Sequence, residues 1–560
     1  MKVDHRDPLP ALARYDGPYY RVLNSYIRER GWPGDLSIAV LSAQYGLIGG
    51  LTQIDNYDRR MDERRAVELR RACTDTLLKW SEAHSSATLL LGKDYLPAID
   101  FAATARLKTT VPAGPIGMKL HALSECLRGF SPTTVRGEMQ SPRARAPMYF
   151  LPDWDDLLDV DFDFQADRFS SPDRATRNEE HCIKIMQPRR MCDGVLVSLA
   201  QNQGTKGILR RFEPTDVESL APQSIRSKYG LRDDQWAFGD CGAFSYSSEP
   251  EPTITTEQAV SLYHLYGFDL GASVDHIPLP FIDGPKGPKA LSEAVKRRRV
   301  RMTHMNARDF MDVWSRRKCT FTPVGIIQGL TARDYARQFP EYVAMGYSFI
   351  ALGGLVPRSD SEIEEIVRAT SKARAFLRKQ DRNVRIHLFG VFRPKLQRTF
   401  RECGVFSFDS ATYFRKAWLR SDQNYLGADG DWYAAIRVPM MSDPRTRTRL
   451  QASGMSEVEL QQLEASSLDA LHEYALGNVT MDHALTAVRR YDELLLRGDE
   501  QGESLYSKYR RTLEAKPWLL CGCSVCLDLG IDIVIFRGYN RNKRRGAHNT
   551  YQLYRSLRGA

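Results

Sequence analysis

The sequence has 560 residues, of which 42% are hydrophobic, so it is long enough for about two to four domains with packed cores. A net charge of +10 favours a polyanionic partner such as a nucleic acid. No run of about 18 apolar residues predicts a membrane span, the first residues lack the apolar core of a signal peptide, and most cysteines are scattered singly. We therefore expect a cytoplasmic protein with reduced thiols.

Residues 1–130 are predicted to form a separate small α/β domain. Leu36–Ser42 and Ala87–Gly92 have the apolar character of strands. Met61–Ala83, between them, is rich in charges and has helical spacing. These signals predict the fold class of the domain and leave its role open.

One phrase of this domain resembles a known sequence pattern. LSAQYGL at residues 41–47, followed by Tyr57 and Asp58, is similar to a small uncharacterised domain marked by LSAKHGL and a later YD. Tyr45 and Asp58 are candidate site residues, but a strand-to-loop turn and a helix cap would explain them equally. The resemblance therefore predicts no chemistry.

Residues 131–190 are predicted to be a basic linker and lead-in segment. Ser131, Arg136, Arg143 and Arg145 are typical of an exposed linker. The apolar phrase that starts at Tyr149 then leads into the next domain.

Residues 191–440 alternate between strand and helix signals. The predicted strands are Gly194–Ala200, Trp236–Gly239, Leu270–Val274, Val324–Gln328, Phe349–Leu352, Ile386–Phe389, Val405–Phe408 and Tyr433–Val438. A series of this kind over about 240 residues is typical of a TIM (β/α)8 barrel, with an open doubly wound sheet as the alternative. No G-x-G-x-x-G motif follows the first strand, so nothing favours dinucleotide binding.

The C-terminal part is predicted to add two elements to the barrel. Residues 441–515 are charged and helical, with leucines at positions 460, 463, 468 and 471 on one face, and we interpret them as a helical insertion. Residues 516–560 contain the cysteine cluster CGCSVC and a basic run, and we interpret them as a small metal-binding subdomain.

Polar residues follow several predicted strands at the point where each strand ends. They are Asp240, Asp275, Gln328 and Asp409, and the glycines Gly353 and Gly354 follow one further strand. In a parallel barrel the carboxyl ends of the strands meet at one edge, where catalytic groups are found. An aspartate, a glutamine and backbone amides can pair with a purine edge, and two further aspartates can divide nucleophilic and acid/base work. The alternative for each aspartate alone is a helix cap.

The order of these motifs resembles the tRNA-guanine transglycosylase family, which has a TIM barrel with a zinc site. The segments that carry the resemblance are DCGAFS from Asp240, DHIP from Asp275, GIIQG ending at Gly329, GGL from Gly353, FGV from Phe389, FDSAT around Asp409, and the cysteine cluster with a later histidine. They span residues 190–550 in the family's order.

The resemblance implies a role for each matching residue. Asp409 would be the nucleophile and Asp240 the acid/base. Asp275 and Gln328 would read the edge of the base, with Gly353 and Gly354 offering the backbone. Phe244 and Phe389 would sandwich a base turned out of its stack, unless they are ordinary core aromatics.

The family's zinc ligands match Cys521, Cys523, Cys526 and His548. Three thiolates and one imidazole form a closed tetrahedral site without an open position for substrate. We therefore expect a structural zinc.

Two departures from the family pattern bear on the substrate. Pro357, Arg358 and Ser359 stand where the family has a segment ending in the glutamate that recognises an aminomethyl group on the deazaguanine. The segment after Asp409 also differs, as Thr412 to Trp418. The loss of the glutamate suggests an uncharged base such as 7-cyano-7-deazaguanine.

The opening LPDWDD and the NRNKRRGAHN phrase look like the branch of the family that acts on DNA. We therefore expect exchange of guanine in DNA for a 7-deazaguanine, with other proteins of a DNA-modification system as further partners. The alternatives are a tRNA-guanine transglycosylase, and an inactive zinc-stabilised subunit that only binds nucleic acid.

Two basic groups are candidate contacts with the nucleic acid. One group is Arg415 and Lys416, beside the proposed nucleophile. The other is the run Arg541, Lys543, Arg544 and Arg545, which a zinc fold around His548 would hold rigid against phosphates. A further cluster lies at residues 296–301. A charge run can also be only a solvated face.

Overall fold

The computed structural model describes residues 2–559 apart from residues 34, 105–106, 131–146, 154–155, 201–218, 222, 285–286, 379–382, 420–421, 452–453 and 497–499. The basic linker expected at Arg136, Arg143 and Arg145 lies outside the described residues. The chain forms two compact units. Unit 1 is Met1–Ser141, Val197–Lys228 and Trp236–Phe389, and unit 2 is Pro142–Leu196, Tyr229–Gln235 and Gly390–Ala560.

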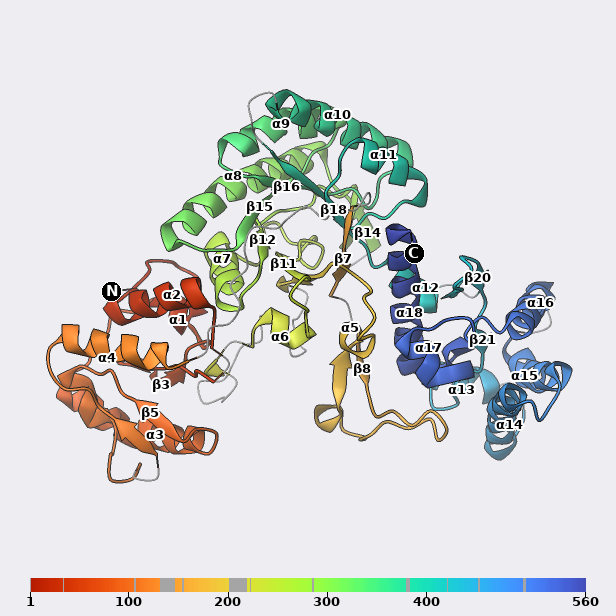
Figure 1. The fold of residues 1–560 in the computed structure, drawn as a ribbon, viewed down its shortest axis with the longest axis horizontal. Coiled ribbons are helices and arrows are strands. Elements are labelled where there is room, and N and C mark those ends of the chain that lie inside the picture. The colour runs from red at the N-terminus through yellow and green to blue at the C-terminus, as the bar shows by residue number, and fades with distance from the viewer. Residues whose placement is uncertain are drawn as a thin grey trace. The chain divides into compact units, whose positions relative to one another are not determined.

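Eight strands form a closed barrel, which confirms the predicted TIM-type α/β fold and excludes the open sheet (Figure 1). The strands are β7 (Met148–Pro152), β10 (Gly194–Ser198), β11 (Trp236–Asp240), β12 (Leu270–Ala272), β15 (Thr322–Ile327), β16 (Phe349–Leu352), β17 (Arg385–Leu388) and β18 (Ser407–Asp409). The last strand pairs in parallel with the first, so that Asp409 lies opposite Phe150.

The barrel begins and ends earlier than the sequence predicted. Its first strand is β7, in the segment that was predicted to be a lead-in, and residues 148–151 of this strand are all buried. The prediction of a barrel strand at Tyr433–Val438 is wrong. That segment contains only the short strands β20 (Trp432–Tyr433) and β21 (Ile436–Arg437), and β21 pairs with β22 (Ile535–Phe536) because β7 already completes the barrel.

The helices of the barrel in unit 1 begin at well-defined caps. They are α7 (Thr256–Leu265), α8 (Glu293–Arg317), α9 (Ala332–Ala344) and α10 (Asp360–Arg378). Thr255 and Thr331 form capping boxes at α7 and α9, and Ser292 caps α8 by accepting a hydrogen bond from Val295. No described helix is long and apolar enough to span a membrane.

The N-terminal part of unit 1 is a small α/β structure. Its elements include α2 (Pro18–Arg30), the antiparallel pair β2 (Ala39–Ser42) and β3 (Gly46–Gly49), α3 (Glu63–Ser81), the parallel pair β5 (Ser86–Thr88) and β6 (Lys108–Thr110), and α4 (Ile116–Arg128). The hydroxyl of Tyr57 lies 2.8 Å from that of Ser42 and 2.5 Å from that of Tyr15. Tyr45 and Asp58 are exposed, and the LSAQYGL phrase contributes Ser42 to this internal polar network.

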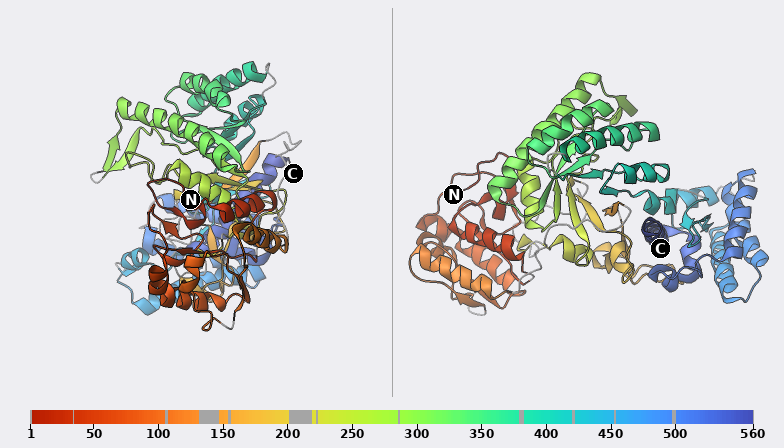
Figure 2. Two further views of the ribbon diagram at one scale, coloured as in Figure 1. Left: turned by 90° about the vertical axis from the view of Figure 1, so that its left-hand side faces the viewer. Right: turned by 45° about the horizontal axis from the view of Figure 1, so that its top comes forward.

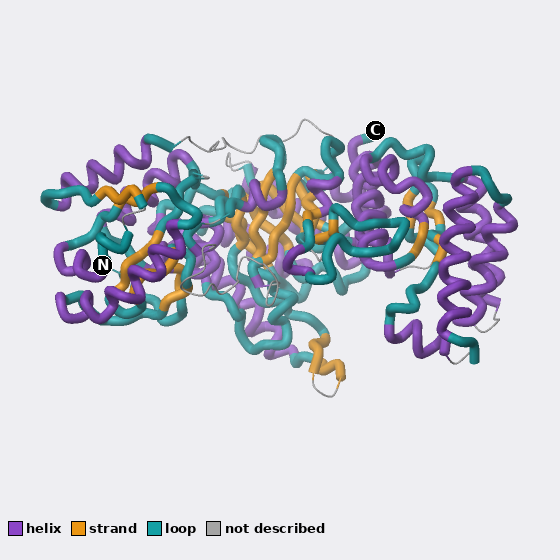
Figure 3. The backbone as a smooth tube through the Cα atoms, turned by 90° about the horizontal axis from the view of Figure 1, so that it is seen from below, coloured by secondary structure: helices purple, strands orange, loops and turns teal. Residues whose placement is uncertain are grey.

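Unit 2 is organised around one long helix, α18 (Gly538–Arg558). α12 (Thr412–Leu419), which directly follows β18, packs against α18. A Cβ at Gly546 would lie 2.8 Å from the carbonyl oxygen of Phe414, so only glycine allows this close approach. The segment predicted to be helical contains α13 (Pro444–Gln451), α14 (Glu457–Leu476), α15 (Met481–Leu496) and α16 (Glu500–Ala515); the last three pack side by side (Figure 3).

Candidate active site

The polar residues predicted at strand ends in unit 1 all lie at the carboxyl ends of barrel strands. Asp240 is the last residue of β11 and Asp275 lies three residues beyond β12. Gln328 directly follows β15, and Gly353 with Gly354 directly follows β16. These strands are neighbours in the barrel and run parallel, so their carboxyl ends share one edge.

Asp275 and Gln328 form the buried centre of this edge. The amide Nε2 of Gln328 donates a hydrogen bond to Oδ2 of Asp275 at 2.7 Å, and the exposed fractions are only 1% for Gln328 and 3% for Asp275. Gln338 holds the main chain there, because its amide donates to the carbonyl oxygen of Gln328 at 2.9 Å. Among the described residues, nothing pairs with Oε1 of Gln328. A buried acceptor without a partner is costly, so it marks a place for a ligand donor.

The two glycines after β16 are required by the side chain of Gln328. A Cβ at Gly353 would lie 2.3 Å from Nε2 of Gln328, and a Cβ at Gly354 would lie 2.6 Å from Oε1. Gly354 also has a φ of +67°, which side chains rarely adopt. Tyr335 fixes the loop by donating to the carbonyl oxygen of Gly353 at 2.8 Å. The backbone of Gly354 thus lies against the unpaired oxygen of Gln328.

Cys241 is a functional candidate that the sequence motifs did not reveal. Its thiol donates to Oδ1 of Asp275 at 3.0 Å, and the hydroxyl of Tyr246 donates to the carbonyl oxygen of Asp275 at 2.8 Å. Burial, followed by the charges of Asp275 and Asp240, raises the pKa of the Cys241 thiol well above its usual value, which keeps the donor proton in place. Burial also raises the pKa of Asp275, while its bonds from Cys241 and Gln328 oppose that rise. In the sequence it appears only as the second residue of the DCGAFS segment.

Arg358 was noticed only as a departure from the family pattern, and the structure gives it a local role. Its guanidinium donates to the carbonyl oxygens of Gly354 at 3.2 Å, Gly329 at 2.7 Å and Leu330 at 3.2 Å. It therefore ties the loop after β15 to the loop after β16. The same contacts place a positive charge behind the loop that carries Gly354.

The two aromatic residues predicted to stack on a base differ in exposure. Phe244, in the loop after β11, is 55% exposed, so it is not a core residue. Phe389 follows β17 and is half-buried, with its ring 5.8 Å from that of Phe238 and 4.7 Å from that of His387. Phe244 has the exposure needed for stacking, and Phe389 also belongs to the aromatic packing of the barrel.

Asp409 lies in unit 2 as the last residue of β18 and is 5% exposed. The backbone N–H of Gly390 donates to its Oδ1 at 2.8 Å. The hydroxyl of Tyr149, from β7, donates to the carbonyl oxygen of Ser410 at 2.7 Å and so fixes the chain just after the strand. These contacts hold the Asp409 carboxylate in one orientation at the carboxyl end of its strand. In unit 1, the N–H of Gly242 orients Asp240 in the same way, by donating to its Oδ2 at 3.0 Å.

The four residues predicted to bind zinc lie together in unit 2. The sulfur atoms of Cys521, Cys523 and Cys526 are 3.6, 3.5 and 3.2 Å from Nδ1 of His548, and all four residues are buried. A tetrahedral zinc with its usual bond lengths separates a sulfur and a nitrogen ligand by about 3.5 Å. The group thus fits a metal ion such as zinc.

The surroundings of His548 also suit a metal ligand. Its Nε2 lies 2.7 Å from the carbonyl oxygen of Leu426, which leaves Nδ1 to face the thiols. The ring of Tyr425 stacks on the imidazole at 4.2 Å, and the amide of Gln552 donates to the sulfur of Cys521 at 3.0 Å. When bound, a zinc ion would fasten the start of α17 (Ser524–Leu529) to α18.

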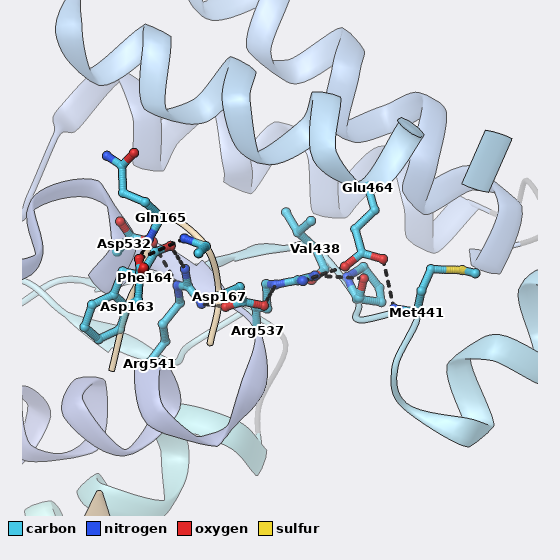
Figure 4. A network of polar contacts seen from close by, with 12 residues as sticks. Asp163, Phe164, Gln165, Asp167, Val438, Met441, Glu464, Asp532, Arg537 and Arg541 are labelled. Atoms are coloured by element: carbon cyan, nitrogen blue, oxygen red, sulfur yellow. Dashed lines mark hydrogen bonds and ion pairs between the residues drawn. The ribbon is translucent and has the colours of Figure 1, made fainter. Parts of the chain in front are cut away.

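The basic run at residues 541–545 was expected to present its charges to phosphates at the surface, and this expectation is wrong. Arg541, Lys543, Arg544 and Arg545 are at most 6% exposed. Arg541 pairs with Asp532 and Asp167, and Asp167 also pairs with Arg537 (Figure 4).

The other three members of the run donate to backbone carbonyl oxygens. Lys543 donates to the carbonyl oxygen of Leu157, Arg544 to those of Asp159 and Val160, and Arg545 to those of Ala417, Ile533 and Ile535. Residues 543–550 are all buried, so α18 is covered on every side along this stretch, and its cationic groups bond within unit 2.

Arg415 and Lys416 lie on α12 and are both half-buried. The ammonium group of Lys416 lies 4.0 Å from the ring centroid of Trp432, which is a cation–π contact. These two residues remain proposed contacts with the nucleic acid.

The fold and the groups at its strand ends define a (β/α)8-barrel enzyme with carboxylates at the catalytic edge. A DNA-guanine transglycosylase of Salmonella montevideo is 32% identical to this chain over 410 residues, which are 73% of this chain and 96% of that protein. The chain therefore belongs to the guanine transglycosylase family, whose members are glycosyltransferases.

More distant similarity extends to archaeal enzymes. A tRNA-guanine(15) transglycosylase of Pyrococcus abyssi is 27% identical over 286 residues, which are 49% of this chain and 44% of that protein. The corresponding enzyme of Thermococcus kodakarensis is 26% identical over 293 residues, 50% of this chain and 45% of its own length. No protein-family model matches the chain.

Proposed function

We propose that this chain exchanges guanine in DNA for a 7-deazaguanine base. The observation that carries the proposal is the set of groups left for a ligand around Asp275, Gln328 and Gly354. Asp275 and Oε1 of Gln328 are acceptors, and the N–H of Gly354 has no acceptor among the described residues. Guanine presents one acceptor and neighbouring N–H donors on its pairing edge, so the two sets are complementary.

The proposed reaction is a double displacement. A carboxylate oxygen of Asp409 attacks C1′ of the target nucleotide, the C1′–N9 bond breaks, and Asp240 gives a proton to the departing guanine. The incoming base then returns its N9 proton to Asp240, and its N9 displaces Asp409 from C1′. One glycosidic bond is broken for each one formed, so no further reactant is needed.

DNA is the proposed polymer because the DNA-acting relative matches this chain over nearly its own full length, whereas the tRNA-acting relatives match over less than half of theirs. The charge of +10 suits either nucleic acid. The runner-up is therefore exchange in tRNA.

The proposed incoming base is 7-cyano-7-deazaguanine. The guanidinium of Arg358 contacts the carbonyl oxygen of Gly354 and adds a positive charge at the loop where the family has a carboxylate. A cation in this place disfavours a base that carries an ammonium group and is compatible with an uncharged nitrile.

A base-exchange assay tests the function. The protein is incubated with radiolabelled guanine and either duplex DNA or tRNA, and label in the polymer is counted. We expect label in DNA alone, displaced more efficiently by the 7-cyano base than by the 7-aminomethyl base. Label in tRNA alone would establish the runner-up, and label in neither polymer would contradict both.

A further inference from the structure

A β-hairpin projects from the barrel in unit 1 between β12 and α8. It consists of β13 (Phe281–Gly284) and β14 (Gly287–Ala290), paired in antiparallel register. Figure 2 shows it as the light green pair of strands standing away from α8. Every residue of β14 is exposed, and Phe281 is 60% exposed. The hairpin therefore adds little to the core, which points to a role at the surface.

Cations gather beside this hairpin on the first turns of α8. Arg297 and Arg298 form ion pairs with Glu293 at 3.0 Å and Glu251 at 2.9 Å, and all four side chains are more than half exposed. Such exposed pairs contribute little and are easily exchanged for phosphate partners. Lys296 and Arg301 also lie on α8, and Lys289 lies on β14. We call these five residues the basic turn.

Three members of the basic turn form no ion pair with another described residue. Within the described part of the chain, no carboxylate pairs with Lys289, Lys296 or Arg301. This differs from the run at residues 541–545, whose cationic side chains are at most 6% exposed and bond to carboxylates or backbone carbonyl oxygens within unit 2. The basic turn is thus the cationic cluster noticed in the sequence that stays available to a polyanion.

The basic turn is rigidly connected to the loops of the candidate site. Arg299, which is 3% exposed, donates to the carbonyl oxygens of Ile277 at 2.9 Å and Glu249 at 3.2 Å. Thr303, one turn later, accepts from the N–H of His276 at 3.0 Å. His276 directly follows Asp275. Because α8 begins where the loop after β12 ends, its first turns lie at the edge that carries the candidate site.

We propose that the hairpin and the basic turn form a DNA-binding surface that holds the phosphates flanking the guanine to be exchanged. The inference rests on the proposed function, since it assumes a polymer whose base enters the barrel. Phosphate contacts position a strand without reading its sequence, and cations fixed by Arg299 to the loop of Asp275 would set the distance between backbone and base pocket. The exposed ring of Phe281 supplies an apolar contact for a sugar or base face beside them.

The test compares two double variants with the same loss of charge. Arg297→Ala with Arg301→Ala removes two cations of the basic turn. The control is Arg64→Ala with Arg71→Ala, two highly exposed arginines on α3, each paired with a carboxylate one turn away. Affinity for a fluorescent duplex is measured over a range of salt concentrations, and base exchange is measured over a range of DNA concentrations.

For the basic-turn variant we expect binding weakened about tenfold or more near 0.1 M salt, and a salt slope lower by about 1.8, which is two contacts at about 0.9 each. The KM for DNA should rise while kcat at saturating DNA stays close to that of the parent. The control should keep the parent's affinity and slope.

Three outcomes would overturn the inference: an unchanged salt slope in the basic-turn variant, an equal loss in the control, or the same loss for tRNA as for DNA. Failure of the proposed function looks different, because the parent itself would then incorporate no base into DNA. A parent that labels DNA, combined with a basic-turn variant of normal affinity, rejects the DNA-binding surface alone.

Discussion

The candidate site of unit 1 and the interior of α18 in unit 2 are both built from buried polar residues, but they use them in opposite ways. In unit 1, Gln328 has one amide atom bonded to Asp275 and the other without a partner. In unit 2, Arg541 bonds two carboxylates and a carbonyl oxygen. The unpaired oxygen of Gln328 identifies a place for a ligand, whereas Arg541, with each of its three nitrogens bonded, holds parts of unit 2 together.

The same contrast separates the two basic clusters of the chain. The run at residues 541–545 looks like a phosphate-binding patch in the sequence, yet it is an internal fastening of α18. The basic turn is mostly exposed, with only Lys296 half-buried. The exposure of the cations in a segment therefore indicates more about a polyanionic partner than their number does.

The largest expected effect is on chemistry. Asp409→Asn should lower base exchange by about 10³-fold or more, because an amide cannot attack C1′. Thermal stability and DNA affinity should stay near those of the parent, and a trapped protein–DNA adduct should form only with the parent. Asp233→Asn, an exposed aspartate in a loop, is the matched control. Substantial turnover by the Asp409 variant would reject it as the nucleophile.

Removal of the metal should cost on the order of several kcal/mol of stability, since structural metal binding contributes directly to folding. We expect about one zinc per chain by elemental analysis. Cys523→Ser should lose the metal and melt at a lower temperature. Cys126→Ser, a half-buried cysteine outside the cluster, should do neither. Normal stability and metal content in the Cys523 variant would contradict the structural role.

Removal of Arg545 tests the internal role of the buried run. Arg545→Ala should lower the free energy of unfolding by about 3 kcal/mol, because three buried carbonyl oxygens lose their donor. The salt slope of DNA binding should not change. Arg555→Ala, on the half-buried side of the same helix, serves as the control in chemical denaturation. A reduced salt slope with unchanged stability would restore the run as a DNA contact.

Truncation of Gln328 tests the other half of the comparison, the ligand-binding role of the buried polar residues in unit 1. Gln328→Ala should reduce kcat/KM for the base by about 10- to 100-fold, which corresponds to about 1–3 kcal/mol for a buried hydrogen-bonding group. The free energy of unfolding should fall by about 1–3 kcal/mol, since Asp275 loses one donor whereas Oε1 has no partner to lose. If the variant exchanged guanine normally but unfolded more easily, Gln328 would be a structural residue.

The smallest effect is a pH dependence of base binding. Asp275 must be ionised to accept hydrogen bonds from the base, and burial raises its pKa above the ordinary value for aspartate. Binding should therefore be complete above this raised pKa and weaken as the pH falls through it. As the pH is lowered at saturating DNA, the KM for the base should begin to rise at a higher pH than it would if an exposed aspartate bound the base. A flat profile down to the ordinary aspartate range would remove Asp275 from base recognition.

Several features followed from the sequence alone because their signals are local. Alternating strand and helix signals predicted the parallel barrel, and apolar runs that end in Asp240 or Gln328 placed these residues at strand ends. The spacing of Cys521, Cys523 and Cys526 likewise predicted the metal site, although only the fold brings His548 to it.

Other features were decided by partners that are distant in the chain. Whether Arg541 is a surface charge depends on Asp167, and whether residues 148–152 are a lead-in or the first strand depends on pairing with β18. The thiol of Cys241 became a donor only when β12 placed Asp275 beside it. Local periodicity determines what a segment can form, but burial and hydrogen bonding depend on what packs against it, and only the tertiary structure fixes that.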